Sequence, residues 1–373
     1  MINRQRLTDE FISLVKIDSL TRQERKMADA LLKKLKDMGL EPYEDDTASK
    51  IGGDAGNVIC HVKGKKQKPA LLLMAHMDTV VPGLSKNPVI DGDIIKTDGK
   101  TVLGGDDAAG IAVILETIRS LIEDKTPFGD IYLAFTVAEE SGLFGARNLD
   151  LSEIPADYAI ILDEGGEIGT VAVKAPYYNR FHVTFTGKAA HAGLEPEKGL
   201  SAIMMASKAI ADMPNFGRID EESTSNIGII KGGQVRNIVC ETCEIEGEVR
   251  SISEEKINRY TDEILSHFKK TAEQLGGTVK IDLEKMYPGF DIKESDDIIS
   301  LLKEASSASD IPMKLHATGG GSDTNIINGA GIPAINTSVG MTNVHSTKEY
   351  IRISDMEKAC HFLTAIIKAA YLR

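Results

Sequence analysis

The sequence predicts an α/β fold with a mixed sheet, interrupted by a smaller inserted α+β domain. Apolar stretches with the length of buried strands alternate with amphipathic helices in the first and last parts of the chain. Between them the order changes to strand-helix-strand-strand-helix-strand, which is typical of a small sheet with helices on one face. We therefore expect one α/β domain from residues 1–177 and 289–373, and an inserted domain, the lid, from residues 178–288.

Length and charge narrow the possible functions. With 373 residues the chain is longer than one hydrophobic core normally supports, which agrees with two domains. Its 43 basic and 56 acidic side chains give a net charge of −13, which argues against nucleic acids and anionic membranes as partners. No apolar stretch approaches the roughly 18 residues of a membrane span, and the N-terminus lacks a signal-peptide core. We expect a cytoplasmic protein.

The helices and strands follow from periodicity and turn residues. Thr21 and Glu24 match a capping box for the second helix, and Ser354 and Glu357 match one for the last helix. In the outer parts of the chain, helices are expected at residues 4–17, 22–38 and 296–306, and strands at 57–62, 70–74, 131–138, 158–162 and 334–339. In the lid, strands are expected at residues 180–187, 225–231, 244–252 and 278–286, and helices at 200–213 and 254–275.

Metal-binding side chains follow three of these strands. His76 and Asp78 end the first, and they share a face because alternate strand residues point the same way. Glu139 and Glu140 follow the second strand, and Asp163 follows the third. In α/β sheets, ligands bind where strands end at their carboxyl termini. These side chains are therefore expected to lie together.

A glycine-flanked pair, Asp106 and Asp107, begins the helix between the first two of these strands. Alone, such a pair could simply cap a helix, because carboxylates are stabilised at the positive end of the helix dipole. Burying acids from all of these segments together, however, requires cations that compensate their charge. Oxygen and imidazole ligands without thiolates suit Zn, Mn, Co or a similar divalent ion.

Seven short motifs carry a resemblance to a known family. They are HMDTV, GGDDAAG, AEESG, LDEGG, AAHAG, GGGSDTN and VHSTKEY, in this order. The chain closely resembles the two-zinc peptidase family that includes peptidase T, aminoacylase, carboxypeptidase G and succinyl-diaminopimelate desuccinylase, with peptidase T nearest. The resemblance covers nearly the whole chain. It implies a catalytic α/β domain with an inserted lid that often forms a homodimer.

Carried over by position, the resemblance implies a site with two divalent ions, most often zinc, with Mn or Co as alternatives. Asp106 would bridge the ions. His76 and Asp163 would complete the protein ligands of one ion, and Glu140 and His345 those of the other. The resemblance also places a cis peptide directly after Asp106. The chain departs from the pattern two residues after this aspartate, where it has alanine and the family commonly has lysine.

The resemblance implies a hydrolytic mechanism. Two ions about 3.5–4 Å apart would share a bridging hydroxide, because they lower the pKa of bound water toward roughly 7. Glu139 would act as general base and pass the proton to the departing amine. Asp78 would accept the second ring N–H of His76, and His191 in the lid would steady the oxyanion, from its own subunit or a partner.

Further residues would bind the substrate. Arg250 and Asn237 in the lid match positions that hold a substrate carboxylate, and Ser322 and Asn325 would present donors from the glycine loop. The structural alternatives are an exposed loop histidine for His191 and a strand-surface salt bridge for Arg250.

Four hypotheses about the function remain open. The leading hypothesis is a metal-dependent aminopeptidase or tripeptidase acting on short peptides. The aspartate at position 163 resembles the aminopeptidase-like members of the family, whereas glutamate there resembles the carboxypeptidase and deacylase members. An N-acyl amino acid amidohydrolase or a carboxypeptidase is the alternative within the family. A peptide-binding relative without turnover is the third, and Glu139 in the base position argues against it. A nucleic-acid or structural interaction module has only the two-domain organisation in its favour.

Overall fold

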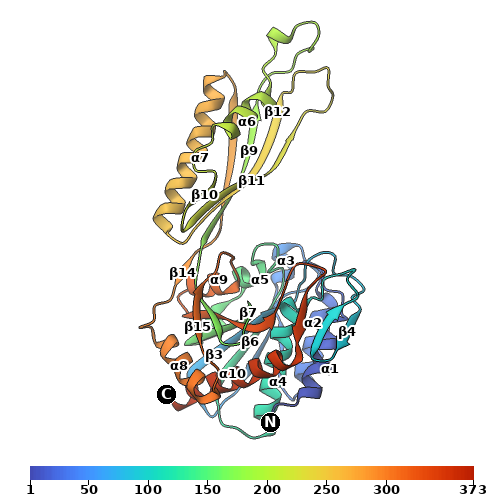
Figure 1. Cartoon of the computed structure of the whole chain (residues 1–373), viewed down its shortest axis with the longest axis vertical. Coiled ribbons are helices and arrows are strands. Elements are labelled where there is room, and N and C mark those ends of the chain that lie inside the picture. The colour runs from blue at the N-terminus through green and yellow to red at the C-terminus, as the bar shows by residue number, and fades with distance from the viewer. The chain divides into compact units, whose positions relative to one another are not determined.

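The computed structural model describes residues 1–373 and divides into two compact units (Figure 1). Unit 1 comprises Met1–Val173, Ile292–Thr318 and Ser322–Arg373, and unit 2 comprises Lys174–Asp291 together with Gly319–Gly321. The chain therefore leaves the first unit, builds the second, and returns.

The large sheet of the structure is mixed, as the sequence predicts. Its strand order is β1-β2-β6-β3-β7-β16-β8-β14, with β15 paired to β8. Strands β6, β3, β7 and β16 are parallel neighbours, so their carboxyl ends meet at one edge. The strands are β1 Tyr43–Glu44, β2 Val58–Val62, β3 Lys66–His76, β6 Gly129–Thr136, β7 Tyr158–Gly165, β8 Thr170–Ala175, β14 Phe290–Asp291, β15 Lys314–Ala317 and β16 Ala334–Met341.

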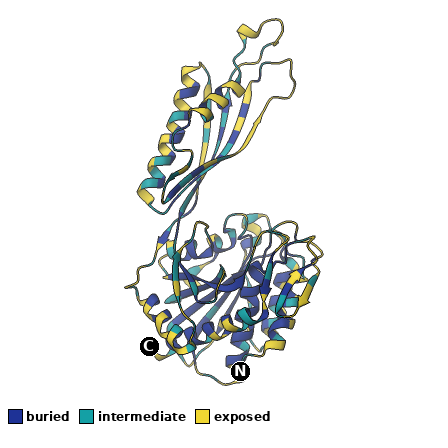
Figure 2. Ribbon diagram, in the orientation of Figure 1, coloured by how far each residue is buried: buried dark blue, intermediate teal, exposed yellow.

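Helices cover both faces of this sheet. Alternate residues of β3 enter different cores: Leu71 and Leu73 pack with α1, α2, α4, α8 and α10, whereas Leu72 and Met74 pack with α5 and α9. The strands are consequently buried from both sides (Figure 2). The helices are α1 Arg4–Val15, α2 Arg25–Asp37, α3 Thr47–Ile51, α4 Gly105–Glu123, α5 Phe144–Asn148, α8 Asp297–Ser309, α9 Asp323–Gly329 and α10 Ile353–Leu372, with a 3₁₀ turn at Leu151–Glu153.

A second, three-stranded sheet in unit 1 is absent from the sequence prediction. It pairs β4 (Pro88–Asp91), β5 (Ile94–Thr97) and β17 (Tyr350–Arg352) in the order β17-β5-β4. Strand β17 comes from a segment more than two hundred residues farther along the chain. It begins at Tyr350, shortly after the predicted ligand His345, so this sheet ties the segment that carries His345 to the rest of unit 1.

Both predicted capping boxes are wrong. Helix α2 begins with Glu24 at its N-cap without a side-chain cap bond, and the Thr21 hydroxyl instead donates to Asp78 Oδ2 at 2.7 Å. The Ser354 hydroxyl donates to Asp93 Oδ2 at 2.5 Å rather than to its own helix. In each case a distant carboxylate, which is a stronger acceptor than a neutral partner, takes the hydroxyl.

Unit 2 is a five-stranded antiparallel sheet with order β10-β11-β12-β9-β13. Helices α6 and α7 pack on one face, and the strands alternate between buried and more exposed positions, as expected for a one-sided sheet. The elements are β9 Tyr177–Thr186, α6 Ala202–Ala211, β10 Gly217–Asp220, β11 Ser223–Gly232, β12 Thr242–Ser251, α7 Glu254–Gln274 and β13 Thr278–Tyr287, with a 3₁₀ turn at Pro196–Lys198. Strand β10 and the 3₁₀ turn are the elements here that the sequence analysis did not predict.

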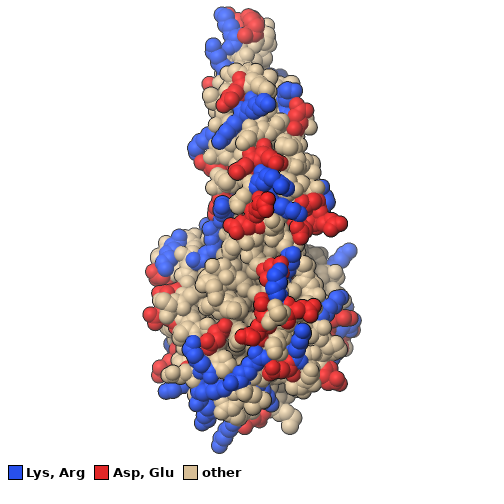
Figure 3. Space-filling view, turned by 90° about the vertical axis from the view of Figure 1, so that its left-hand side faces the viewer, with Lys and Arg blue, Asp and Glu red and all other residues tan.

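The surface shows no single sign of charge on the face drawn in Figure 3, where acidic and basic side chains are interspersed over both units. No helix is long and apolar enough to cross a membrane. All four cysteines are free and buried.

Candidate metal centre

The Asp106 carboxylate lies at the centre of the predicted ligands. Its Oδ1 atom is 2.9 Å from His76 Nε2, and this nitrogen is 3.7 Å from Asp163 Oδ1. Its Oδ2 atom is 3.1 Å from His345 Nε2, which is 2.9 Å from Glu140 Oε1. Each Asp106 oxygen therefore faces one histidine with one further carboxylate. The structure thus brings the five predicted ligands together around Asp106.

Asp107 also lies in this cluster, although the sequence analysis did not propose it as a ligand. The ligand atoms of His76, Asp107 and Asp163 lie within 4.8 Å of one another. Both Asp107 oxygens, however, already accept backbone N–H groups: Oδ2 from His76 at 3.2 Å and Oδ1 from Gly110 at 3.0 Å. Asp107 therefore joins the end of β3 to the start of α4. The peptide bond between Asp106 and Asp107 is cis, as the resemblance implies.

The electrostatics of the cluster fit bound cations. Burial raises the pKa of Asp163 to about 8, and it also raises the pKa of Glu140. Burial opposes ionisation of Asp106 too, but hydrogen bonds from His345 and His76 hold its pKa below the ordinary range. Hydrogen bonds to Asp106 and Glu140 raise the pKa of His345 to about 10. At neutral pH, protons held by these groups therefore offset part of the negative charge of the carboxylates, as bound cations would. The donor set of carboxylates and imidazoles fits two divalent ions.

The Asp78 carboxylate holds the turn that carries the two glutamates. Its Oδ1 accepts from the Glu139 N–H at 2.9 Å, and its Oδ2 accepts from the Glu140 N–H at 3.3 Å. The role of this carboxylate in orienting the His76 ring stays a prediction. Nδ1 of His76 is 2.9 Å from the main-chain oxygen of Asp78 and 3.5 Å from its Oδ1.

Glu139 has the surroundings expected of a proton acceptor. It is only 8% exposed, and burial raises its pKa well above the ordinary value, while the nearby His76 opposes this rise. A carboxylate with a raised pKa accepts protons more readily at neutral pH. The cluster of acids at the end of β6 therefore includes one side chain suited to proton transfer.

Two buried residues that support this site were missed by the sequence analysis. Asn336 on β16 accepts from the Asp163 N–H at 2.9 Å and donates to the Asp163 carbonyl at 3.0 Å, which fixes that residue from both sides. Glu24 accepts from the N–H of Ala138 at 3.0 Å. Ala138 has a φ of +50° and follows the end of β6 at Thr136, which is earlier than predicted. No local pattern marks Asn336, and Glu24 was interpreted as part of a helix cap.

The predicted lid residues His191 and Asn237 lie on loops of unit 2. Both are exposed. The His191 Nδ1 atom accepts from the N–H groups of Gly193 and Leu194, at 3.1 Å each. The main-chain oxygen of Asn237 accepts from Ala192 N at 3.0 Å, so the two loops lie against each other. The accepting Nδ1 leaves the ring proton of neutral His191 on Nε2.

Arg250 lies on β12 and has partners within unit 2. Its Nε donates to Glu248 Oε1 at 3.1 Å, and its guanidinium lies 4.3 Å from the centre of the Tyr178 ring. The structural alternative for this residue, a strand-surface salt bridge, is therefore formed in the structure. A substrate carboxylate would have to compete with Glu248.

Ser322 and Asn325 begin helix α9 in unit 1, and both are buried. The Asn325 side-chain oxygen accepts from the Ser322 N–H at 3.0 Å. The structure thus uses this pair at the start of a helix. Ala108, where the family pattern has lysine, packs in the main hydrophobic core with 5% exposure.

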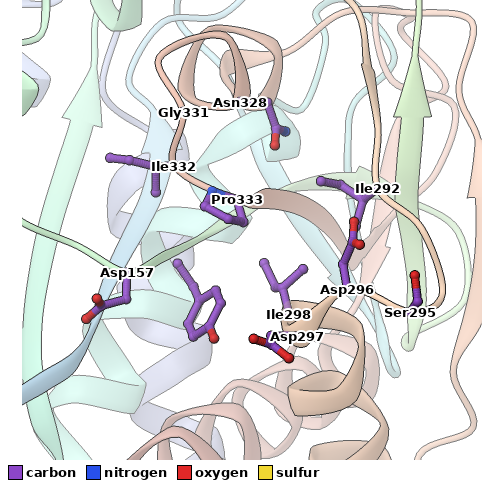
Figure 4. Close-up of a pocket in the computed structure, with 11 residues that line it drawn as sticks. Asp157, Ile292, Ser295, Asp296, Asp297, Ile298, Asn328, Gly331, Ile332 and Pro333 are labelled. Atoms are coloured by element: carbon purple, nitrogen blue, oxygen red, sulfur yellow. The ribbon is translucent and has the colours of Figure 1, made fainter.

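A pocket of about 640 Å³, drawn in Figure 4, has none of the predicted ligands in its lining. It borders the start of β7 at Tyr158 and the residues just before β16, whereas Asp163 lies near the carboxyl end of β7. The Asp157 carboxylate beside it already accepts from Ala70 N at 2.8 Å and from Lys68 Nζ at 3.0 Å. We do not assign the metal chemistry to this pocket, which is lined by Asp157, Tyr158, Ile292, Ser295, Asp296, Asp297, Ile298, Asn328, Gly331, Ile332 and Pro333.

Three family profiles match parts of the chain. The M20 profile described as "Peptidase dimerisation domain" matches residues 178–275, within unit 2. The profile "Peptidase family M28" matches residues 57–173, within unit 1. The profile "M42 glutamyl aminopeptidase" matches residues 267–362. All three describe peptidases.

Several relatives match over the whole chain, and two of them with solved structures are described as peptidases. The chain is 44% identical to the protein YqjE of Bacillus subtilis, over 99% of this chain and 100% of that protein. Among solved structures, the aminopeptidase PepT of Bacillus cereus is 42% identical with a TM-score of 0.90, covering 99% of both chains. A tripeptidase from Staphylococcus aureus is 36% identical with a TM-score of 0.94, covering 100% of both chains. The chain belongs to the M20 peptidase family, among its peptidase T-like members.

Proposed function

We propose that the protein is a metal-dependent exopeptidase that releases the N-terminal residue of short peptides, as an aminopeptidase or tripeptidase. The observation that carries this proposal is the Asp106 carboxylate, whose two oxygens lie 2.9 Å and 3.1 Å from different histidines. The relatives described as an aminopeptidase and a tripeptidase support the exopeptidase class.

We assign two divalent ions to this cluster. His76, Asp106 and Asp163 would hold one ion, and Asp106, Glu140 and His345 the other. Zinc is the first candidate, and Mn and Co are alternatives, because the donors are imidazole and carboxylate groups. When bound, the ions would polarise the scissile carbonyl and lower the pKa of water, which makes hydroxide available at neutral pH.

The chain's own residues would then move protons and steady charge. Glu139 would accept the proton of the attacking water on its carboxylate and deliver it to the leaving amine nitrogen. Asp78 would keep Glu139 in place, because the Asp78 carboxylate accepts the backbone N–H of Glu139. His191 would donate from Nε2 to the developing oxyanion, and the occupied Nδ1 supports this tautomer. Arg250 and Asn237 would hold the substrate carboxylate, with Ser322 and Asn325 as further donors.

The alternatives differ in the group that flanks the cleaved bond. An N-acyl amino acid amidohydrolase would need no free amine, and a carboxypeptidase would release the C-terminal residue. A peptide-binding protein without turnover would not need a buried Glu139 beside the ligands. We rank the aminopeptidase first because the two cited structures carry that description.

A substrate panel tests this order. Free-amino di- and tripeptides, their N-acetylated and C-amidated forms, and N-acyl amino acids are incubated with protein loaded with Zn²⁺, Mn²⁺ or Co²⁺, and products are identified by mass spectrometry. We expect cleavage after the first residue of free-amino tripeptides. Preferential cleavage of N-acyl amino acids would replace the proposal by the amidohydrolase. Elemental analysis of protein purified without added metal identifies the ion.

We also propose that the protein forms a homodimer through unit 2. Strand β10 pairs only with the start of β11, so the remaining edge of β11 is open, and Ile230 on it is 50% exposed. Natural proteins usually cover such an apolar edge. The match of residues 178–275 to a dimerisation profile supports dimerisation through unit 2. Sedimentation of an Ile230→Lys variant should show a monomer; an unchanged dimer would place the interface elsewhere.

A cytoplasmic location stays a prediction from the sequence.

A further inference from the structure

The segment that carries His345 is a closed loop. Its ends are joined by two hydrogen bonds, from Thr342 N to the Tyr350 carbonyl and from Tyr350 N to the Thr342 carbonyl, both at 3.1 Å. His345 lies within the loop with a φ of +59°, and its side chain is 52% exposed. Glu349 directly precedes Tyr350, which makes both of these hydrogen bonds, and it is only 2% exposed. The loop thus has one exposed metal-binding side chain and one buried carboxylate.

The Glu349 carboxylate holds the backbone that leads into the bridging aspartate. Its Oε2 accepts from the Gly104 N–H at 2.9 Å, and its Oε1 accepts from the Asp106 N–H at 3.1 Å. A Cβ atom at Gly105, between these two residues, would lie 3.0 Å from Oε1. The chain therefore passes the carboxylate so closely that only glycine fits without displacement. These N–H groups lie at the start of α4, where backbone donors lack helical partners.

Asp106 is consequently held at two points by one loop. Glu349 binds its backbone N–H, and His345 contacts its Oδ2 atom at 3.1 Å, from a position four residues earlier. Lys86 completes the surroundings of the buried charge. It is 7% exposed, interacts electrostatically with Glu349, and its Cε would lie 3.3 Å from a Cβ on Gly104.

We infer that Glu349 is a positioning residue that sets the geometry of both metal positions, by fixing the backbone of Asp106 and the loop that carries His345. This inference rests on the proposed metal centre. Glu349 itself contacts no ion and no substrate. Residues behind the ligands of a metal site typically change metal affinity or activity by about 10- to 100-fold when they are replaced.

The test is a Co²⁺ titration of the metal-free full-length protein, followed by visible absorption and calorimetry. In Glu349→Gln, the amide nitrogen cannot accept, so one of the two backbone N–H groups loses its partner. We expect a folded protein whose Co²⁺ dissociation constants rise by about 10- to 100-fold, and whose kcat recovers at high Co²⁺ while KM stays unchanged.

Glu116→Gln is the matched control. Glu116 is also fully buried and also accepts a backbone N–H, from Asn3 at 2.8 Å, but it pairs with Arg6 and lies in the middle of α4. We expect it to lower the melting temperature without changing Co²⁺ binding. Equal weakening of Co²⁺ binding in both variants would overturn the inference, because any loss of stability would then produce the effect.

Gly105→Ala provides a second variant if Glu349→Gln does not fold. Its Cβ would press on Glu349 Oε1, while the next nearest atoms lie at 3.7 Å and 3.8 Å. We expect weaker Co²⁺ binding here too. Wild-type dissociation constants in a folded Glu349→Gln or Gly105→Ala protein would overturn the inference alone. Failure of the wild-type protein to bind Co²⁺ would instead overturn the proposed metal centre.

Discussion

The residues predicted from the sequence have different surroundings in the two units. In unit 1, the predicted ligands converge on Asp106 with contacts between 2.9 Å and 3.7 Å. In unit 2, His191 and Asn237 are exposed on loops, and Arg250 is paired with Glu248. The first group has a geometry that already indicates its chemistry, whereas the second has only a place in a motif.

The difference follows from burial. A group of buried carboxylates is unfavourable unless cations compensate them, so their convergence in unit 1 itself demands an explanation. An exposed side chain such as His191 carries no such penalty, and its position alone is compatible with several roles. Substitutions and ion removal can test this contrast. If it holds, changes at the buried residues of unit 1 should lower activity much more than changes at the exposed residues of unit 2.

Removal of the ions should have the largest effect. Dialysis against a strong chelator should abolish peptide hydrolysis, and about two equivalents of Zn²⁺ or Co²⁺ should restore it. The free enzyme and the reconstituted enzyme are compared on one tripeptide under saturating conditions. Activity that survives when elemental analysis finds no bound metal would contradict the metal centre and remove the contrast between the units.

The same titration has a predicted pH dependence. In the ion-free site the pKa of Asp163 is about 8 and that of His345 about 10, so both groups hold protons at neutral pH. An ion must displace these protons, and rising pH leaves fewer protons to compete. Ion affinity should therefore increase from pH 6 to pH 8. Calorimetry in buffers with different ionisation enthalpies measures the released protons; pH-independent binding without proton release would contradict the prediction.

Replacement of the two adjacent glutamates should have the next largest effects, and these should differ in kind. Glu139→Gln should keep both ions and lower kcat by about 10²- to 10⁴-fold, because it removes proton transfer. Glu140→Ala should weaken one ion. Metal analysis and kinetics of both variants distinguish the roles. Full activity in Glu139→Gln, or two tightly bound ions in Glu140→Ala, would show that the roles are misassigned.

Strand ends were the part of the site that the sequence could predict. His76 and Asp163 belong to apolar strands whose length and burial are visible in the sequence, and parallel neighbours bring their carboxyl ends together. The mixed sheet follows from the same alternation of strands and helices. The strand ends and the mixed sheet depend on periodic patterns within single segments, so they can be predicted from one sequence.

Contacts between distant segments could not be predicted in this way. Thr21 and Ser354 match local capping motifs, yet Asp78 and Asp93 take their hydroxyl groups. Glu349 accepts hydrogen bonds from backbone N–H groups of residues more than two hundred positions away, and no local pattern predicts such a bond. The three-stranded sheet that includes β17 is formed by similarly distant segments. The hydrogen-bond partners of these side chains therefore depend on the tertiary fold and cannot be predicted from local motifs.

His191→Ala tests whether an exposed loop residue of unit 2 is catalytic. Loss of an oxyanion donor should lower kcat by about 10²- to 10³-fold without changing ion content. His182→Ala is the matched control, because His182 is a partly exposed histidine on β9 of the same unit and has no assigned role. Equal kinetics for both variants and the wild-type protein would leave His191 as a loop histidine.

Arg250 should give the smallest effect, and it separates the two interpretations of unit 2. If its guanidinium binds the substrate carboxylate, Arg250→Met should raise KM by about 10- to 100-fold for peptides with a free C-terminus, since a hydrogen bond to a charged group contributes about 1.5–3 kcal/mol. C-amidated peptides should be unaffected. Glu248→Gln should leave KM unchanged or lower it, because it weakens the pairing that competes with substrate.

The opposite result has an equally clear signature. A partly exposed salt bridge contributes about 0–1 kcal/mol, so a purely structural Arg250 would lower the melting temperature slightly in both variants and change KM in neither. The two variants remove the same ion pair but leave different partners behind. A rise in KM confined to Arg250→Met would therefore come from loss of the guanidinium itself. Substrate binding would then involve a side chain of unit 2 in addition to the buried residues at the strand ends of unit 1.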